Sequence, residues 1–469
     1  MIGREGHRRL ILLTLVITGF AALLRMAFVL AVLASSRLTP PERPWSPDAS
    51  AAQYPTGYLM NDSGTYLDPA HEALRGHLAG IGTLLRPPGY PAFLALLGTS
   101  PGAVLVAQAL LGALIAAAGV LLTYMLTQDV SLSGGAGLVL AVSPTGIGLT
   151  GLIMADLLLS VVFAIGLSLL VASVRYRRTG WLHLAGLVFG LGVLVKPVLF
   201  AWAPFSVLVA WLVAGGSLRF APIRAIMLFV VLQLAPAGIW AACNYARDGV
   251  FTVSSIGPIT ARLYLGSQTM AWARAHHRPD AAAVTRLRAD AWKQLDSLWQ
   301  LDSLDAPREQ IRWAKATTLQ ILRANPKAAV HAYLDNLNGS TGGEAWSYFP
   351  SELVSYPAAH GALKRLARLE AETRRLGRWL LLACVAAAIT TIVLARQRPL
   401  PQLALDVCAL AVPMLFFLVF SGITSLTGPR IMYPASAAAV AMGAVALRGM
   451  GGLRAPARRE MVGSAGMPE

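Results

Sequence analysis

Long apolar stretches, separated by short polar turns, recur along both halves of the 469-residue chain. A membrane-spanning helix needs about 20 mostly apolar residues. The segments 182–197 and 199–214 are short for this purpose and could form one kinked unit, so the count is uncertain by one or two. The pattern predicts about ten spanning helices, at 10–33, 102–127, 132–150, 152–174, 182–197, 199–214, 222–242, 378–395, 403–421 and 431–448.

Two long polar segments, 34–101 and 243–377, interrupt the apolar pattern. The second is rich in Trp, Arg and Asp, and its pattern is mostly helical. Its repeat of Leu-Asp-Ser-Leu at 295–298 and 301–304 indicates an amphipathic helix. We therefore expect an all-α polytopic membrane protein. Its parts are an N-terminal module at 1–242 with an exterior loop at 34–101, a large exterior loop at 243–377, C-terminal spanning helices at 378–449 and a tail at 450–469.

Composition supports a membrane location. Hydrophobic residues make up 56% of the chain and charged residues 13%, whereas soluble domains carry about 25% charged residues. The net charge of +16 would suggest nucleic acid in a soluble protein. Here no nucleic-acid-binding motif accompanies it, and cytoplasmic loops that face anionic lipid account for much of it.

The arginines also predict an orientation, because cytoplasmic loops collect Lys and Arg. With the N-terminus inside, every informative short loop obeys this rule, and the exterior turns near 151, 198 and 422–429 hold almost no basic residue. We expect a multi-pass protein of the plasma (inner) membrane with both termini in the cytoplasm. The arginines that carry this prediction are Arg175, Arg177, Arg178, Arg219, Arg224, Arg396, Arg398, Arg448, Arg454, Arg458 and Arg459.

The first apolar run resembles a signal peptide, but it is longer than a typical signal core of about 7–15 residues, and Arg25 interrupts it late. We expect an uncleaved spanning helix. The three cysteines, Cys243, Cys384 and Cys408, lie in or beside apolar runs, and we interpret them as small buried residues without a disulfide framework.

Several charged residues are predicted to lie at one level, the exterior membrane face. Each has an ordinary explanation: Asp62 as a helix N-cap, Asp156 as a carboxylate at a helix start, Lys196 as a snorkelling side chain. Ionisable side chains within the membrane are rare unless they have a function. The occurrence of several such residues at one level therefore favours a functional site. The full set is Asp62, Arg86, Asp156, Lys196, Arg247, Arg262 and Arg430.

Five short motifs, in order along the chain, resemble the polytopic lipid-phosphate-dependent glycosyltransferases of the GT-C superfamily. The greatest likeness is to the protein O-mannosyltransferase and aminoarabinose transferase branch. The motifs are Asp62-Ser63-Gly64-Thr65-Tyr66-Leu67 followed by Arg86-Pro87-Pro88-Gly89-Tyr90-Pro91; Ser143-Pro144 followed by Met154-Ala155-Asp156-Leu157; the helix end from Gly190 to Lys196-Pro197; Asn244-Tyr245 with Gly249, Ser254-Ser255 and Leu263-Tyr264-Leu265-Gly266; and Gly428-Pro429-Arg430 with Tyr433-Pro434. The chain departs from relatives at Asn61-Asp62, Asp156 and Arg262, where an acidic pair, a glutamate and an asparagine are common.

The resemblance implies transfer of a sugar from a polyprenyl-phosphate donor to an acceptor hydroxyl on a lipid, glycan or protein outside the cytoplasm, with inversion. Asp62 and Asp156 are the candidate catalytic residues, and Asp62 is the preferred base. The candidate substrate-binding residues are Arg86, Tyr90, Lys196, Asn244, Arg262, Tyr264, Arg430 and Tyr433.

Three other functions remain open at the level of sequence. The first is that of a related GT-C enzyme that uses a lipid-linked oligosaccharide or arabinose. The second is a transporter or flippase of a lipid-linked sugar, although no internal repeat is evident. The third is a non-catalytic membrane scaffold. No cofactor is expected. A divalent metal at His71, Glu72 and His77 is possible, but exposed helix residues are the preferred explanation.

Overall fold

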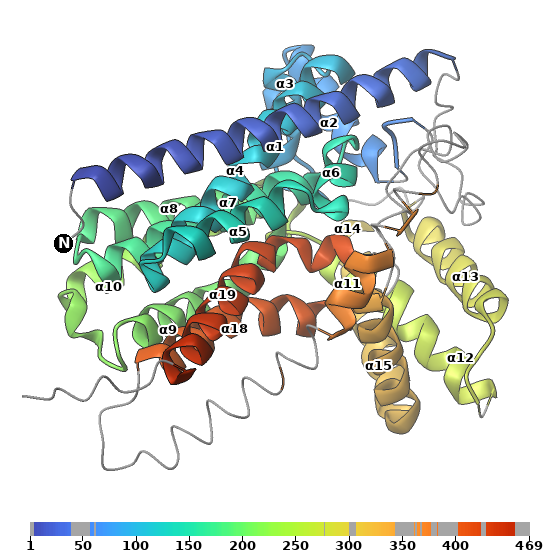
Figure 1. The fold of residues 1–469 in the computed structure, drawn as a ribbon. Coiled ribbons are helices and arrows are strands. Elements are labelled where there is room, and N and C mark those ends of the chain that lie inside the picture. Colours follow the sequence, from blue (N-terminus) through green and yellow to red (C-terminus); the bar gives the residue numbers. More distant parts are fainter. Residues whose placement is uncertain are drawn as a thin grey trace, which may run out of the picture.

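The computed structural model describes residues 4–38, 57–60, 62–275, 277–299, 306–342, 361, 364–365, 368–376, 382, 402–423 and 428–454. Within these ranges the regular elements are helices, as the sequence predicts (Figure 1). The bundle contains α1 (Arg4–Leu38), α4 (Pro101–Thr127), α5 (Val130–Ala141), α6 (Pro144–Thr150), α7 (Ala155–Arg175), α8 (Thr179–Val195), α9 (Ala203–Val213), α10 (Ile223–Asp248), α18 (Gln402–Ser421) and α19 (Ser436–Arg454).

In the described part of the chain, five helices are long and apolar enough to cross a membrane: those within α1, α4, α7, α10 and α18. The pair α5 and α6, bent by 49°, makes a sixth if it is one broken span. The apolar helices at 179–195 and 197–213 are shorter. Each predicted span therefore coincides with a helix or a broken helix, except 378–395, which lies outside the described residues. The chain is a membrane protein.

Contacts at the helix ends show the directions in which α7, α8 and α9 cross the bundle. The start of α7 lies beside Lys196, the residue after α8. At the other end of α7, Arg175 pairs with Asp406 near the start of α18, and there Gln402 donates a hydrogen bond to the carbonyl of Val213, the last residue of α9. Thus α7, α8 and α9 run alternately between two ends of the bundle, and 182–197 and 199–214 belong to two antiparallel helices joined by the 3₁₀ turn η3 (Pro197–Trp202).

Close contact between α8 and α10 depends on two glycines. A Cβ on Gly186 would lie 2.5 Å from the carbonyl oxygen of Phe229, and one on Gly190 would lie 2.5 Å from that of Leu232. Small residues allow backbones to approach in this way inside lipid, where packing replaces the hydrophobic effect as the force between helices. These glycines set how closely α8, the helix that leads to Lys196, lies against α10.

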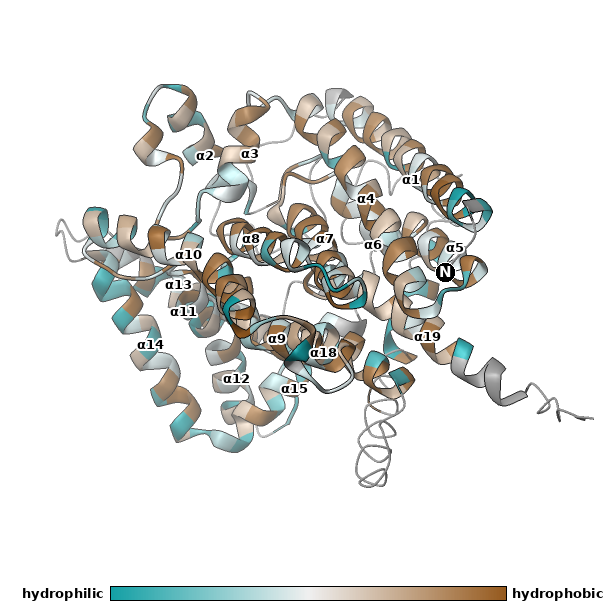
Figure 2. Cartoon of the chain, turned by 90° about the vertical axis from the view of Figure 1, so that its left-hand side faces the viewer, coloured by the Kyte–Doolittle hydropathy of each residue, from teal (hydrophilic) through white to brown (hydrophobic). Residues whose placement is uncertain are grey.

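The helices between α10 and Gly342 lie at one end of the bundle. Figure 1 shows α11 (Ile256–Thr260), α12 (Ser267–Ala275), α13 (Ala281–Trp299), α14 (Ala306–Ala324) and α15 (Pro326–Gly342) opposite the start of α1 and the end of α19. The described ends of the chain thus lie at the same end of the bundle. The bundle helices are mostly hydrophobic, whereas hydrophilic residues are frequent on α13 and α14 (Figure 2). The predicted helical character of 243–377 is confirmed in its described part.

The interpretation of the cysteines as buried is wrong for Cys243, which is exposed on α10, while Cys408 is half-buried. The apolar pattern of α10 gave no warning, because a helix facing lipid is as apolar as one facing the protein core. Cys384 lies outside the described residues.

Candidate active site

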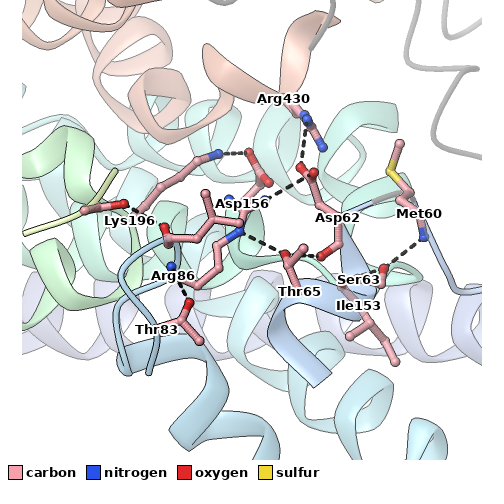
Figure 3. Close-up of polar contacts among 12 residues, drawn as sticks. Met60, Asp62, Ser63, Thr65, Thr83, Arg86, Ile153, Asp156, Lys196 and Arg430 are labelled. Atoms are coloured by element: carbon pink, nitrogen blue, oxygen red, sulfur yellow. Dashed lines mark hydrogen bonds and ion pairs between the residues drawn. The ribbon is translucent and has the colours of Figure 1, made fainter. Parts of the chain in front are cut away.

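Asp62 directly precedes α2 (Ser63–Leu74), the position of a helix N-cap, but its side chain makes no capping hydrogen bond. Instead, Oδ1 lies 3.2 Å from Nη2 of Arg86, and Oδ2 lies 3.6 Å from Nη2 of Arg430 (Figure 3). Ser63 holds this turn in place, because its hydroxyl donates to the carbonyl of Ile153 and accepts from the amide of Met60, both at 2.9 Å. The side chain of Asp62 is 40% exposed and is therefore reachable from solvent.

Arg86 is fixed by its surroundings on three sides. Its Nε donates to the hydroxyl of Thr65 at 2.9 Å, and its amide donates to the hydroxyl of Thr83 at 3.0 Å. The guanidinium lies 4.5 Å from the centre of the Tyr66 ring, within cation–π range. Burial raises the pKa of Tyr66 to about 12, so this phenol stays neutral beneath the cation.

Gly89 brings the Arg86 loop against the end of α8. A Cβ at this position would lie 2.6 Å from the carbonyl carbon of Leu194 and 2.7 Å from the amide nitrogen of Val195. Any larger residue would push the two segments apart. The stiff Arg-Pro-Pro-Gly-Tyr-Pro turn therefore sets the distance between Arg86 and the residue that ends α8, Lys196.

Lys196 and Asp156 form an ion pair, with Nζ 2.6 Å from Oδ1. Asp156 is 1% exposed, whereas Lys196 is 25% exposed. The sequence explained Asp156 as a carboxylate at a helix start and Lys196 as a snorkelling lysine. Neither explanation predicts the ion pair between them, because each considers one residue alone. The pair joins the first turn of α7 to the end of α8.

Asp62 with its two arginines and the Asp156–Lys196 pair form one cluster (Figure 3). Burial alone would raise the pKa of Asp62, but Arg86 and Arg430 outweigh burial and hold that pKa below its usual value. Lys196 acts in the same direction, and Figure 3 shows its pair with Asp156 beside Asp62. Asp62 is consequently ionised at neutral pH. Five of the predicted residues, Asp62, Arg86, Asp156, Lys196 and Arg430, are brought together by the fold.

Arg430 lies in η7 (Gly428–Ile431), just before η8 (Tyr433–Ala435). Tyr433 is buried, and its ring reaches across to α6, where a Cβ on Gly146 would lie 1.9 Å from its hydroxyl oxygen. Tyr433 thus packs against the broken span and anchors the turn that presents Arg430.

Two other predicted substrate-binding residues make local contacts. Tyr90 is buried, and its hydroxyl donates to Oε1 of Gln108 at 2.8 Å. Asn244 donates to the carbonyl of Thr252 at 2.7 Å and accepts from Arg247 at 3.0 Å. Their roles in binding substrate stay predictions.

Arg247 also lies apart from the cluster. Besides Asn244, it contacts the carboxylate of Asp248 at 2.8 Å and the carbonyl of Gly82 at 2.8 Å. Its contacts connect the end of α10 to the loop before Arg86. Arg262 and Tyr264 lie in the predicted exterior segment, in the turn after α11.

Sequence reasoning missed a clamp on the break between α5 and α6. Arg25 of α1 is fully buried and donates to the carbonyls of Leu140 at 3.1 Å and Ala141 at 2.9 Å, which the end of α5 leaves free. Glu370 accepts from the amide of Thr145 at 3.0 Å, at the start of α6. An arginine inside an apolar run was a visible signal for the first half of this clamp. Nothing in the sequence pointed to Glu370, because its partners lie over 200 residues away.

Gln108 was also overlooked, although a glutamine inside the run 102–127 is a polar residue at membrane depth. Its amide donates to the carbonyls of Thr150 at 3.1 Å and Leu152 at 2.8 Å. It thereby fixes the turn that leads to Asp156.

No group of three His, Cys, Asp or Glu side chains arranged to hold a metal occurs among the described residues. At the candidate set weighed from the sequence, the carboxylate of Glu72 contacts Arg75 at 2.6 Å and Nδ1 of His77 at 2.9 Å. These side chains lie at the exposed end of α2, and His71 is exposed on the same helix.

No family model matches the chain, and no curated protein matches it either. Among solved structures it resembles the crystal structure of an Archaeoglobus fulgidus oligosaccharyltransferase tethered to an acceptor peptide containing the NVT sequon, with a TM-score of 0.43 and 14% identity. The match covers 90% of this chain and 49% of that protein, so this chain spans about half its length. The functional argument rests on the residues of this chain.

Proposed function

We propose that the chain is a membrane glycosyltransferase of the GT-C type, which transfers a sugar from a polyprenyl-phosphate donor to an acceptor hydroxyl on the non-cytoplasmic face, with inversion. The observation that carries the proposal is the cluster itself. A reachable carboxylate, Asp62, lies between two arginines, beside a second carboxylate paired with a lysine. The order of the motifs that supply these residues matches the GT-C pattern described above.

The cations suit a phosphate leaving group. A phosphate leaves as an anion and needs no protonation, but it does need positive charge as the bond to the sugar breaks. Lys196 and Arg430 are the residues we assign to this role. Lys196 follows α8 and Arg430 precedes α19. A donor with its tail in lipid would place its phosphate at this level, at the ends of the bundle helices. Lys196 can exchange part of its contact with Asp156 for the phosphate, because it is 25% exposed.

Asp62 is assigned as the base. Its carboxylate is ionised and its side chain is 40% exposed, whereas the side chain of Asp156 is 1% exposed. In the proposed step, the acceptor oxygen forms a bond to the anomeric carbon and the acceptor proton passes to Asp62. The bond from that carbon to the phosphate oxygen breaks, with its electrons leaving on the phosphate. Attack from the face opposite the phosphate inverts the centre through an oxocarbenium-like state.

Arg86 is assigned a positioning role in this scheme. It holds Asp62 through the 3.2 Å contact and is itself held by Thr65 and Tyr66. Asp156 orients Lys196 in the same manner. Both effects preorganise charge before the substrate arrives, which is the main way enzymes stabilise a transition state.

The proposal is tested first in cells, by mass analysis of envelope glycans with and without the gene. Loss of one sugar from a glycan, lipid or protein supports it. The purified protein in lipid vesicles is then given radiolabelled polyprenyl-phosphate hexoses and pentoses together with acceptor material from the deletion strain. Transfer of label supports a transferase. Movement of the intact labelled lipid across the vesicle membrane, without transfer, supports the transporter alternative and contradicts the proposal.

A further inference from the structure

The exterior segment contains a π-helical turn, η5 (Ala261–Gly266), between α11 and α12. Such turns are rare and are frequent at functional sites. This one carries two of the predicted substrate-binding residues, Arg262 and Tyr264. The turn is therefore a place to look for a ligand contact.

Arg262 is a buried cation that lacks a counter-charge within the described part of the chain. It is 6% exposed, and its Nε and Nη1 atoms are buried there without a hydrogen-bond acceptor. Its guanidinium lies 5.3 Å from the centre of the Trp313 ring. A buried charge without a paired acceptor is strongly unfavourable. A ligand that brings acceptor atoms would remove that penalty.

Arg288, from α13, adds a second guanidinium beside the same turn. It lies 4.7 Å from the centre of the Tyr264 ring, and its Nε is likewise buried without an acceptor in the described structure. Neither arginine forms an ion pair with a described carboxylate, whereas Arg86, Arg247 and Arg430 all do. Each arginine thus lies beside an aromatic ring, Trp313 for Arg262 and Tyr264 for Arg288, and neither has a described carboxylate within ion-pair distance.

This place adjoins the candidate active site. The hydroxyl of Ser254 donates to the carbonyl of Leu85 at 2.6 Å, and the amide of Ser255 donates to that of Leu84 at 2.8 Å. Leu85 also packs into the apolar cluster that contains Leu263. The residue after Leu85 is Arg86, so the turn is attached directly to the loop that holds Asp62. Burial raises the pKa of Tyr264, and the charges of Asp62, Arg430 and Arg86 also act on it.

We propose that Arg262 and Arg288 form an anion subsite that binds an acidic group, a phosphate or a carboxylate, on the acceptor molecule. The proposal rests on the proposed function and deepens it by giving the acceptor class: a hydroxyl compound with a negative group close to the reacting oxygen. This assigns Arg262, a predicted substrate-binding residue, to the acceptor.

The acceptor is favoured over the donor by the position of the two arginines. The donor phosphate is attached to a lipid tail, so its cations belong at the ends of bundle helices, as Lys196 and Arg430 do. Arg262 and Arg288 instead lie on the helices beyond the end of the bundle (Figure 1). That end of the bundle is the predicted non-cytoplasmic side, from which a soluble acceptor would arrive.

The test measures two ligand classes separately, on the full chain in lipid nanodiscs. Glucose 6-phosphate, glucuronate and glucose are the soluble probes, and decaprenyl phosphate in the nanodisc is the lipid probe. We expect at least one sugar anion to bind about 10- to 100-fold more tightly than glucose, the effect of one or two charge-assisted hydrogen bonds. Arg262→Gln and Arg288→Gln should remove that preference and leave decaprenyl phosphate binding unchanged.

Matched variants separate the subsite from charge and from folding. Arg286→Gln removes the same charge from an exposed position on α13 and should bind every probe as the unaltered chain does. Arg262→Lys keeps the charge and should recover part of the preference. Thermal unfolding without ligand shows whether each variant is folded. If Arg262→Gln unfolds, Arg288→Gln still tests the subsite, because Arg288 is only half-buried.

Three results would overturn the proposal. They are equal binding of glucose and both sugar anions, unchanged anion binding in both glutamine variants, or loss of decaprenyl phosphate binding in those variants, which would place the arginines in the donor site. If sugar anions bind through Arg262 and Arg288 but decaprenyl phosphate does not bind at all, the subsite stands and the donor assignment in the proposed function fails.

Discussion

Replacing Asp62 by Asn removes one negative charge and the proton acceptor while it keeps the size of the side chain. In the structure Asp62 lies 3.2 Å from Arg86 and 3.6 Å from Arg430, so the amide can still accept a hydrogen bond from one of them. Helix α2 should be unaffected, because the side chain makes no capping bond. We expect a folded protein with a severe loss of transfer.

The two effects differ enough in size to be told apart. Each arginine loses part of a charge-assisted contact, so stability should fall by about 1–3 kcal/mol. A protein with a typical stability of about 5–15 kcal/mol stays almost entirely folded after such a loss. Loss of a general base lowers the rate about 10²- to 10⁴-fold. Unfolding therefore cannot account for the expected loss of activity.

The assay is transfer of labelled sugar by the purified variant in lipid vesicles, with thermal unfolding measured on the same sample. Asp68→Asn is the matched control, because it removes the same charge from an exposed position on α2. It should transfer at the normal rate. A stable Asp62→Asn protein with near-normal transfer would refute the assignment and leave Asp156 as the next candidate.

The pH dependence gives an independent check on the same residue. Arg86 and Arg430 hold the pKa of Asp62 below its usual value, so the carboxylate stays ionised above that lowered pKa and is protonated only as the pH falls through it. The dependence of transfer on Asp62 should therefore be flat from neutral pH down to about pH 5. A base-limb pKa near 6 or 7 in the rate profile would point to another group.

The remaining predictions concern the donor, the helix break and the orientation. Lys196→Ala and Arg430→Ala should each weaken decaprenyl phosphate binding about 10- to 100-fold, since each removes a charge-assisted bond to phosphate; normal binding by both would exclude this donor site. Glu370→Ala should lower stability by about 1–3 kcal/mol in a thermal or denaturant unfolding measurement, because it frees a partly buried amide, while Glu372→Ala, at an exposed neighbour, should not. In a chain whose own cysteines are replaced, Ser297→Cys should react with an impermeant thiol reagent on intact cells; reaction only after lysis would reverse the proposed orientation.

The sequence by itself determined which segments form the bundle, because a run of about 20 apolar residues has few alternatives to a membrane helix. It also gave the level of Asp62, Arg86, Asp156, Lys196 and Arg430. Each follows or precedes an apolar run, and runs of similar length that alternate in direction bring such residues to a common end. That prediction needs only the order of spans and turns.

Only the tertiary structure decided which charges pair. Asp62 stands at the position of a helix N-cap. Its neighbours in the sequence do not show whether it caps the helix or pairs with Arg86 and Arg430, which are 24 and 368 positions away. Lys196 meets Asp156 because α7 and α8 are antiparallel neighbours, which brings the end of α8 beside the start of α7. Such contacts depend on helix rotation and depth, which a hydrophobic pattern leaves undetermined.

The break between α5 and α6 illustrates the same limit. The sequence shows one apolar run at 132–150 with Pro144 inside it, and a proline is compatible with a kink or with an end. Arg25 and Glu370, from opposite ends of the chain, bind the carbonyls and the amide that the break frees. Backbone groups inside a membrane must find partners within the protein, and the identity of those partners is a property of the assembled bundle and not of any segment alone.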